Sequence, residues 1–280
     1  MAANEAPIPA TSEEWLALCR RATAGVEQAL ARYPEVEDRS QKTGRGEGGD
    51  MALVIDREAE DAIFHELEAL GQPLTAVSEE RGRVALHGGG PTMVVIDPID
   101  GSLNARRGMP LYCLSIAVAD GSTMADVRYA FVHDLGSGEE WWAERGRGAC
   151  LDGRPLRPLE PVSRVEVLGI ESGDPRRIAR ASEALAATTA HRLRLIGSIA
   201  LGLCWAAAGR YDALLSLRSV RSVDAAAGQL LVREAGGAVI FPDAQDGRLG
   251  APLDLDMRSA VVAGRTHGLV TELARGVLGA

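Results

Sequence analysis

The chain of 280 residues lacks several patterns that would assign it to a class at once. Its formal net charge is −9, so it has no basic excess that would favour nucleic acid or an anionic membrane as a partner. No stretch approaches the roughly 20 consecutive apolar residues of a membrane span. Residues 1–12 contain no basic segment followed by an apolar one, so we expect no secretory signal. These absences predict a cytoplasmic protein without a membrane or nucleic-acid partner.

Cysteine is scarce and dispersed. The four cysteines form no CxxC pattern of the kind that binds zinc or exchanges disulfides, which fits a reduced protein. No internal repeat or low-complexity tract is evident. What is present is an ordinary globular composition, with 46% hydrophobic and 25% charged residues. The length allows one large domain or two fused halves.

The first half of the chain mixes helices and strands. Thr11 or Ser12, followed by two glutamates, predicts a helix start, and helical periodicity continues to Tyr33. A second helix is expected from about Asp56 to Leu70. The glycine-rich residues 40–50 permit either a connector or a mobile lid over a phosphate site. Strands are predicted at 74–77, 93–96, 113–119 and 126–132, and a hairpin at 139–156.

The second half begins at about residue 161 and alternates strands with helices. We therefore divide the chain into residues 1–160 and 161–280. The predicted strands of the second half are 165–170, 191–195, 213–217, 238–241 and 260–263. Its predicted helices are 174–188, 199–208, 223–235 and 266–278.

The most informative stretch is Val94–Asn104, in which an apolar run delivers Asp97 and Asp100 into a turn that contains a proline. Because burying an unpaired carboxylate is costly, we expect both aspartates just past a strand that ends at Ile96, where open α/β sheets place their ligand sites. Two convergent carboxylates repel each other, which favours a shared hard cation such as Mg²⁺. The alternative is a solvated turn.

Other carboxylates also lie at the ends of predicted elements. Asp56 and Asp224 stand at helix starts, where the alternative role is that of a helix cap. Glu79 and Glu80 follow a strand, where the alternative is a solvated turn. Their joint occurrence at element ends favours one site.

Three motifs carry a resemblance to a known family. They are Ser78-Glu79-Glu80, the run from Ile96 to Asn104, and Val223-Asp224-Ala225-Ala226-Ala227-Gly228 continued by Glu234-Ala235-Gly236-Gly237. Over about residues 12–275 the chain resembles the inositol monophosphatase family of Mg²⁺-dependent, Li⁺-sensitive phosphatases. The resemblance implies an α+β fold, the five-layer αβαβα sandwich, and a homodimer. It also makes the two halves one continuous catalytic unit, with most metal ligands in the first.

The resemblance also implies a set of metal ligands for two or three Mg²⁺ ions per active site. Glu79, Asp97 and the main-chain carbonyl of Ile99 would hold one ion. Asp97, Asp100 and Asp224 would hold a second, with Asp97 as the bridge. A pair of ions roughly 4 Å apart can stabilise the entering and leaving oxygens of an in-line displacement.

The catalytic and substrate-binding roles follow from the same resemblance. Ser102 would orient the attacking water, with Asp56 as its hydrogen-bonded partner, and Glu79 would help accept the proton. Backbone N–H groups of Gly101 and Ser102 would contact the phosphate at a helix start. The segment expected to contact the substrate is Gly197, Ser198 and Ile199.

The match weakens around the substrate. Leu217, Val223 and Ala105 replace residues that inositol-selective members carry. Residues 217–224 instead resemble the archaeal-type branch, whose members also hydrolyse fructose 1,6-bisphosphate. Arg218 is our candidate for binding a second phosphate. For the arginines of this region the alternative is surface charge: Arg106, Arg107, Arg218 and Arg221.

We therefore expect an enzyme that hydrolyses the phosphate monoester of a small polyol or sugar. Inositol 1-phosphate is the first candidate substrate and fructose 1,6-bisphosphate the second, while histidinol phosphate and adenosine 3′,5′-bisphosphate stay open. A catalytically silent relative that acts as a regulatory binding protein would have lost a metal ligand or the hydroxyl at position 102. The sequence retains all of them.

Overall fold

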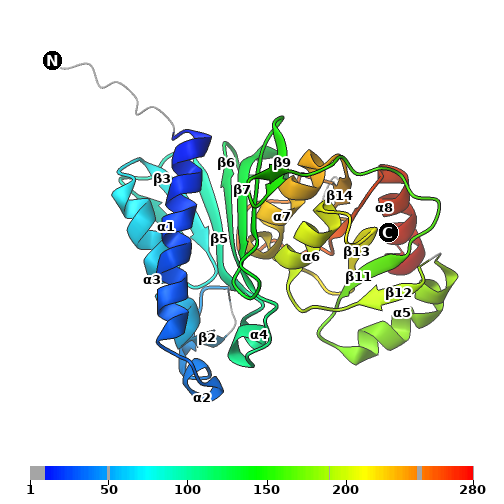
Figure 1. The fold of residues 1–280 in the computed structure, drawn as a ribbon, viewed down its shortest axis with the longest axis horizontal. Coiled ribbons are helices and arrows are strands. Elements are labelled where there is room, and N and C mark those ends of the chain that lie inside the picture. The colour runs from blue at the N-terminus through cyan, green and yellow to red at the C-terminus, as the bar shows by residue number, and fades with distance from the viewer. Residues whose placement is uncertain (1–9, 49–50, 189, 245–247, 280) are drawn as a thin grey trace.

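The elements of the chain stack in five layers, α, β, α, β and α, in the computed structural model, which describes residues 10–48, 51–188, 190–244 and 248–279 (Figure 1). Helices α1 (Ser12–Ala31) and α3 (Val54–Ala69) cover the outer face of the larger sheet. The middle layer is α6 (Ile199–Ala207) with α7 (Ser222–Glu234), and the outer layer at the other end is α5 (Pro175–Ala187) with α8 (His267–Leu273). The predicted five-layer sandwich is confirmed.

The larger sheet has eight strands in the order β10-β9-β8-β7-β6-β5-β3-β4. Neighbouring strands are antiparallel except β3 and β5, which are parallel. The predicted hairpin at 139–156 is confirmed as the three strands at one edge. The strands are β3 (Leu74–Ser78), β4 (Gly82–Leu86), β5 (Met93–Asp100), β6 (Cys113–Ala119), β7 (Val127–Asp134), β8 (Glu140–Glu144), β9 (Gly148–Leu151) and β10 (Arg154–Pro155).

The smaller sheet has five strands in the order β12-β11-β13-β15-β14. Strand β11 is parallel to both its neighbours, and β15 is antiparallel to both of its own. All strands of this sheet follow residue 166, whereas those of the larger sheet precede residue 156. The strands are β11 (Val167–Glu171), β12 (Arg192–Arg194), β13 (Ala213–Ser216), β14 (Ala238–Ile240) and β15 (Val262–Gly264).

Helix α1 begins where the sequence predicts. Thr11 is its N-cap, and a capping box is formed with Glu14: the Glu14 N–H donates to the threonine hydroxyl at 3.3 Å, and the Thr11 N–H donates to the glutamate at 2.7 Å. Residues three or four apart, from Trp15 to Val26, are buried against α3 and the larger sheet. No helix of the described residues combines the length and apolarity needed to cross a bilayer.

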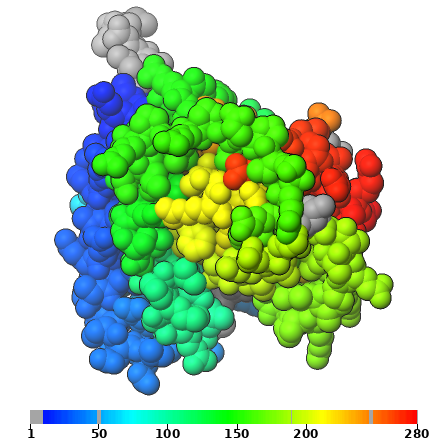
Figure 2. Space-filling view, turned by 45° about the vertical axis from the view of Figure 1, so that its right-hand side comes forward, coloured from blue at the N-terminus to red at the C-terminus, as the bar shows by residue number. Residues whose placement is uncertain are grey.

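The middle layer joins the two halves. Helices α6 and α7 pack together at close range because α7 carries Gly228, where an added Cβ would lie 2.5 Å from the Leu203 Cβ. The N-terminus of α6 and the first turn of α7 thereby approach the end of β5, where the acidic residues lie. In Figure 2 the segment around α6, coloured yellow, lies between the green strands of the larger sheet and the yellow-green α5.

Some boundaries differ from the predictions. Strand β5 does not end at Ile96 but continues to Asp100, with a bulge between Asp97 and Asp100. Both aspartates are therefore buried within the strand rather than just past its end. Pro98 supplies no N–H for the sheet, and a bulge at such a position re-aims the neighbouring side chains.

The segment at 40–50 is partly a strand, since β1 (Lys42–Arg45) pairs with β2 (Met51–Leu53); residues 49–50 lie outside the described residues. The terminal helix α8 ends at Leu273 and continues as a π-helical turn, Ala274–Leu278. The short helix α2 (Val36–Arg39), the 3₁₀ turn Met124–Asp126 and β4 were not predicted. The helix start expected at Gly101 and Ser102 is present, since α4 (Ser102–Arg106) begins there with Gly101 as its N-cap.

Candidate active site

A cavity of about 470 Å³ opens at the end of β5, between the two halves of the chain. Two kinds of charged side chain line it. The acidic ones are Asp56, Glu79, Glu80, Asp97, Asp100 and Asp224, and the basic ones are Lys42, Arg106, Arg218 and Arg221. Ile99, Gly101, Ser102 and Gly197 also line the cavity, so every predicted site residue except Ser198 and Ile199 borders it.

Three of the predicted metal ligands form a compact cluster. One carboxylate oxygen from each of Asp97, Asp100 and Asp224 lies within 4.8 Å of the others, and all three side chains are buried. Burial, followed by the charges of neighbouring carboxylates, raises the pKa of Asp97 well above its ordinary value. Burial and the nearby Asp224 raise the pKa of Asp100 to about 7. Such a cluster of repelling oxygen ligands fits a hard divalent cation, and Mg²⁺ prefers this donor set.

The turn after β5 depends on glycine. Gly101 has a φ of 95°, and an added Cβ would lie 2.8 Å from the carbonyl oxygen of Leu111. The turn is tied together by two hydrogen bonds: the Ile99 N–H donates to Asp97 Oδ1 at 3.1 Å, and the Ser102 hydroxyl donates to the Ile99 carbonyl at 2.9 Å. These bonds hold Asp97, Ile99 and Ser102 against one another at the cavity.

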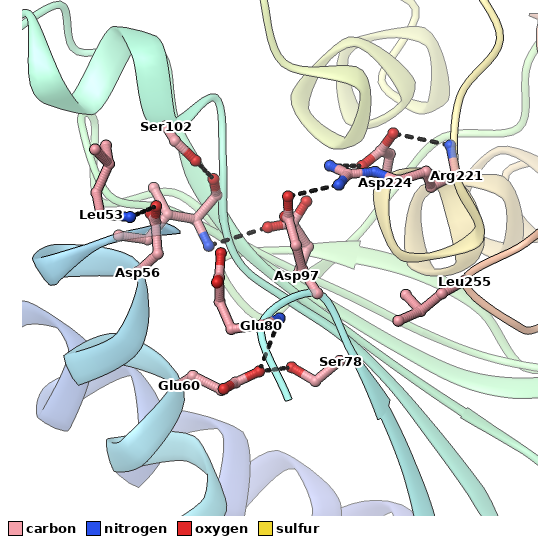
Figure 3. Close-up of polar contacts among 12 residues, drawn as sticks. Leu53, Asp56, Glu60, Ser78, Glu80, Asp97, Ser102, Arg221, Asp224 and Leu255 are labelled. Atoms are coloured by element: carbon pink, nitrogen blue, oxygen red, sulfur yellow. Dashed lines mark hydrogen bonds and ion pairs between the residues drawn. The ribbon is translucent and has the colours of Figure 1, made fainter. Parts of the chain in front are cut away.

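Asp56 lies on the opposite side of Asp97 from Asp224 (Figure 3). Its Oδ2 accepts the Leu53 N–H at 3.2 Å, so the helix-cap role is confirmed for that oxygen. The other oxygen, Oδ1, is buried and has no hydrogen-bond partner among the described residues. Burial, and next the charge of Glu79, raise the pKa of Asp56 to about 7. Asp56 therefore has one oxygen in use and one available to a ligand.

Glu60 supports this side of the site and was not predicted. Its Oε1 accepts hydrogen bonds from the Ser78 hydroxyl and from the N–H groups of Glu80, at 3.3 Å, and Arg81, at 3.2 Å. The buried Glu60 carboxylate thus holds the turn that carries Glu79 and Glu80. The sequence feature that could have identified Glu60 is its position one helical turn after Asp56, on a largely apolar face of α3.

On the other side, Ser198 and the N-terminus of α6 hold Asp100. The Ser198 hydroxyl donates to Asp100 Oδ2 at 2.7 Å, and the Ala200 N–H donates to the same oxygen at 2.6 Å. Ser198 and Ile199 are buried behind the aspartate, so their predicted contact with substrate stays a prediction. Gly197 reaches the cavity, and its N–H donates to the buried Glu171, a second residue that the sequence analysis missed.

We expect Ser198→Ala to weaken Mg²⁺ binding, because it removes a donor that orients Asp100. Loss of such an outer partner typically costs about 10–100-fold in metal affinity. The Mg²⁺ dependence of phosphate release measures the effect. Ser182→Ala, on the exposed side of α5, is the matched control. An unchanged Mg²⁺ dependence in Ser198→Ala would contradict this role.

The four arginines of this region differ in their surroundings. Arg221 is largely buried and contacts two acidic side chains, so the surface-charge alternative is wrong for it. Arg106 and Arg218 line the cavity, whereas Arg107 is exposed and does not. Neither Arg106 nor Arg218 makes a hydrogen bond or ion pair through its side chain within the described part of the chain.

Together, the five-layer fold and a cavity with clustered carboxylate oxygens fit a metal-dependent hydrolytic site. A model of the inositol monophosphatase family matches residues 12–278. The chain belongs to that family and is a phosphomonoesterase of its type.

Two relatives and one solved structure show the extent of this similarity. The chain is 34% identical over 262 residues to a fructose-1,6-bisphosphatase/inositol-1-monophosphatase of Methanothermobacter thermautotrophicus, covering 89% of this chain and 91% of that one. It is 35% identical over 200 residues to an inositol-1-monophosphatase of Mesorhizobium japonicum, covering 68% and 72%. The crystal structure of the extragenic suppressor protein SuhB from Bartonella henselae superposes with a TM-score of 0.77 at 27% identity, covering 94% of this chain and 97% of that one.

Proposed function

We propose that the chain hydrolyses the phosphate monoester of a small polyol or sugar, with inositol 1-phosphate as the first substrate and Mg²⁺ as the cofactor. The observation that supports this most directly is the buried cluster of Asp97, Asp100 and Asp224 at the wall of an open cavity. The cavity is polar and its volume, about 470 Å³, suits a small phosphorylated ring.

Five residues would hold two or three Mg²⁺ ions. They are Glu79, Asp97, Asp100 and Asp224 through their carboxylates, and Ile99 through its main-chain carbonyl. When bound, Mg²⁺ supplies Lewis acidity that polarises a phosphate and lowers the pKa of water. Ligands come from residues 1–160 and from Asp224, which supports one catalytic unit built from both halves.

The remaining residues would position the reactants. Asp56 Oδ1, which has no partner among the described residues, and the Ser102 hydroxyl would orient the attacking water. Glu79 would accept its proton. The N–H groups of Gly101 and Ser102, at the turn into α4, would contact the phosphate. No protein nucleophile is required in this scheme.

A second substrate, fructose 1,6-bisphosphate, is favoured by the basic part of the cavity. Lys42, Arg106 and Arg218 line it, and their side chains form no hydrogen bond or ion pair within the described ranges. An arginine with free donors suits a second phosphate. Leu217 stands where inositol-selective members carry a glutamate. The relative from Methanothermobacter carries both activities in its name.

Phosphate release with Mg²⁺ tests the proposal on a panel of inositol 1-phosphate, fructose 1,6-bisphosphate, histidinol phosphate and adenosine 3′,5′-bisphosphate. Turnover of the first, or of the first two, supports it. If only histidinol phosphate or adenosine 3′,5′-bisphosphate is hydrolysed, the proposed substrate class is wrong. Arg218→Gln separates the two leading substrates, because it should raise KM for the bisphosphate more than for inositol 1-phosphate.

Two further properties are proposed from the family resemblance. Li⁺ should inhibit phosphate release, which a titration at fixed Mg²⁺ measures. The chain should form a homodimer, which light scattering after gel filtration measures.

A further inference from the structure

Arg221 lies among the acidic side chains of the site. Its Nη1 is 2.6 Å from Glu79 Oε1. Its Nη2 is 3.1 Å from Asp224 Oδ1, and these two residues are labelled in Figure 3. The side chain is 15% exposed. A single guanidinium therefore bridges two carboxylates that come from different halves of the chain and that both belong to the proposed metal ligands.

The charge balance of the cavity explains why this contact exists. Buried carboxylates that repel one another need a counter-ion. Lys42, Arg106 and Arg218 also line the cavity, but the structure places none of them within 4.0 Å of a carboxylate oxygen of a described residue. Of the four basic side chains at the cavity, Arg221 is thus the one that directly contacts proposed metal ligands among the described residues.

The bridge occupies two carboxylates that are also proposed metal ligands, those of Glu79 and Asp224. The guanidinium would strongly repel a second cation held by the same carboxylates in a partly buried site. The backbone of Arg221 is anchored separately, because its N–H donates to Asp224 Oδ2 at 2.9 Å. The guanidinium can therefore leave while the start of α7 stays in place.

We propose that Arg221 is the counter-ion of the metal-free site, and that Mg²⁺ binding displaces its guanidinium from Glu79 and Asp224. Arg221 then lowers the affinity of the site for Mg²⁺ and stabilises the fold when Mg²⁺ is absent. The displaced guanidinium remains at the cavity, where its planar donors suit phosphate oxygens. This inference rests on the metal centre proposed above.

Calorimetric titration of the whole chain with Mg²⁺ alone tests the proposal in Arg221→Gln. The dissociation constant should fall about tenfold or more, equivalent to about 1.4 kcal/mol. The thermal midpoint without Mg²⁺ should fall as well. Arg106→Gln removes the same charge from the cavity wall without removing a contact, and screening should limit its effect to about twofold.

An Mg²⁺ affinity in Arg221→Gln that is unchanged or weaker than that of the wild type overturns the proposal, since Arg221 would then only support the ligands. If Arg221→Gln does not fold, Arg221→Lys takes its place. A lysine cannot bridge both carboxylates as a fork, so it should still bind Mg²⁺ more tightly than the wild type, and a failure to do so overturns the proposal. If the wild type binds Mg²⁺ no more strongly than Asp97→Asn does, the proposed metal centre is wrong. The inference about Arg221 then fails with it.

Discussion

Asp97→Asn should abolish phosphate release while leaving the fold intact. Asparagine keeps the size of the side chain and the oxygen that accepts the Ile99 N–H, but it removes a charge from the residues that would hold the metal. We expect kcat to fall about 1,000-fold or more, equivalent to about 4 kcal/mol of transition-state stabilisation. The phosphate-release assay on the best substrate of the panel measures this.

The thermal stability of this variant should not fall together with its activity. Asp97 is buried, and the charges of Glu79, Asp100 and Asp224 raise its pKa further. Removing the charge relieves this repulsion, so the metal-free variant should melt no lower than the wild type. Asp256→Asn, on an exposed loop, is the matched control and should keep full activity. If Asp97→Asn retains a turnover within tenfold of that of the wild type, the assignment of Asp97 as a metal ligand is wrong.

Gly228→Val should lower both stability and activity, although residue 228 does not border the cavity. An added Cβ would lie 2.5 Å from the Leu203 Cβ and 2.7 Å from its Cδ1, so α6 and α7 must move apart. Overpacking of this kind costs about 1–3 kcal/mol, and occasionally more. At about 2–4 °C per kcal/mol for a chain of this order of size, the thermal midpoint should fall by roughly 2–12 °C.

The loss of activity in Gly228→Val should exceed what the loss of stability explains. Helix α7 carries Asp224 in its first turn, and the N-terminus of α6 holds Asp100 through Ser198 and Ala200. Separating the helices therefore separates two proposed ligands of one ion. Gly268→Val, in α8, is the control because nothing lies within 4 Å of its added Cβ. Full activity of folded Gly228→Val at low temperature would contradict this link between packing and site.

Much of the fold could be predicted because its local signals are strong. The capping box at Thr11, the buried stripe of α3 and the glycine pair after α7 each mark an element by nearby residues alone. The failures occur where distant residues decide. Strand β5 continues through Asp97 and Asp100 because β6 pairs with it as far as Cys113. Strand β4 forms on an edge next to β3, although it is only five residues long and begins with Gly82 and Arg83.

The sequence by itself determined the family, because motifs are properties of neighbouring residues, and the resemblance to that family implied the five layers. It also determined the acidic residues that face the cavity, because they follow or begin locally predicted elements. Only the tertiary structure decided which oxygens are already engaged. It assigned Ser198 to Asp100, placed Glu60 beneath the Glu79–Glu80 turn, and placed Arg221 between Glu79 and Asp224. The physical reason is that a hydrogen bond or an ion pair depends on distances of about 3 Å between atoms. Residues 142 positions apart, such as Glu79 and Arg221, reach such a distance only when both sheets and the helices between them are packed.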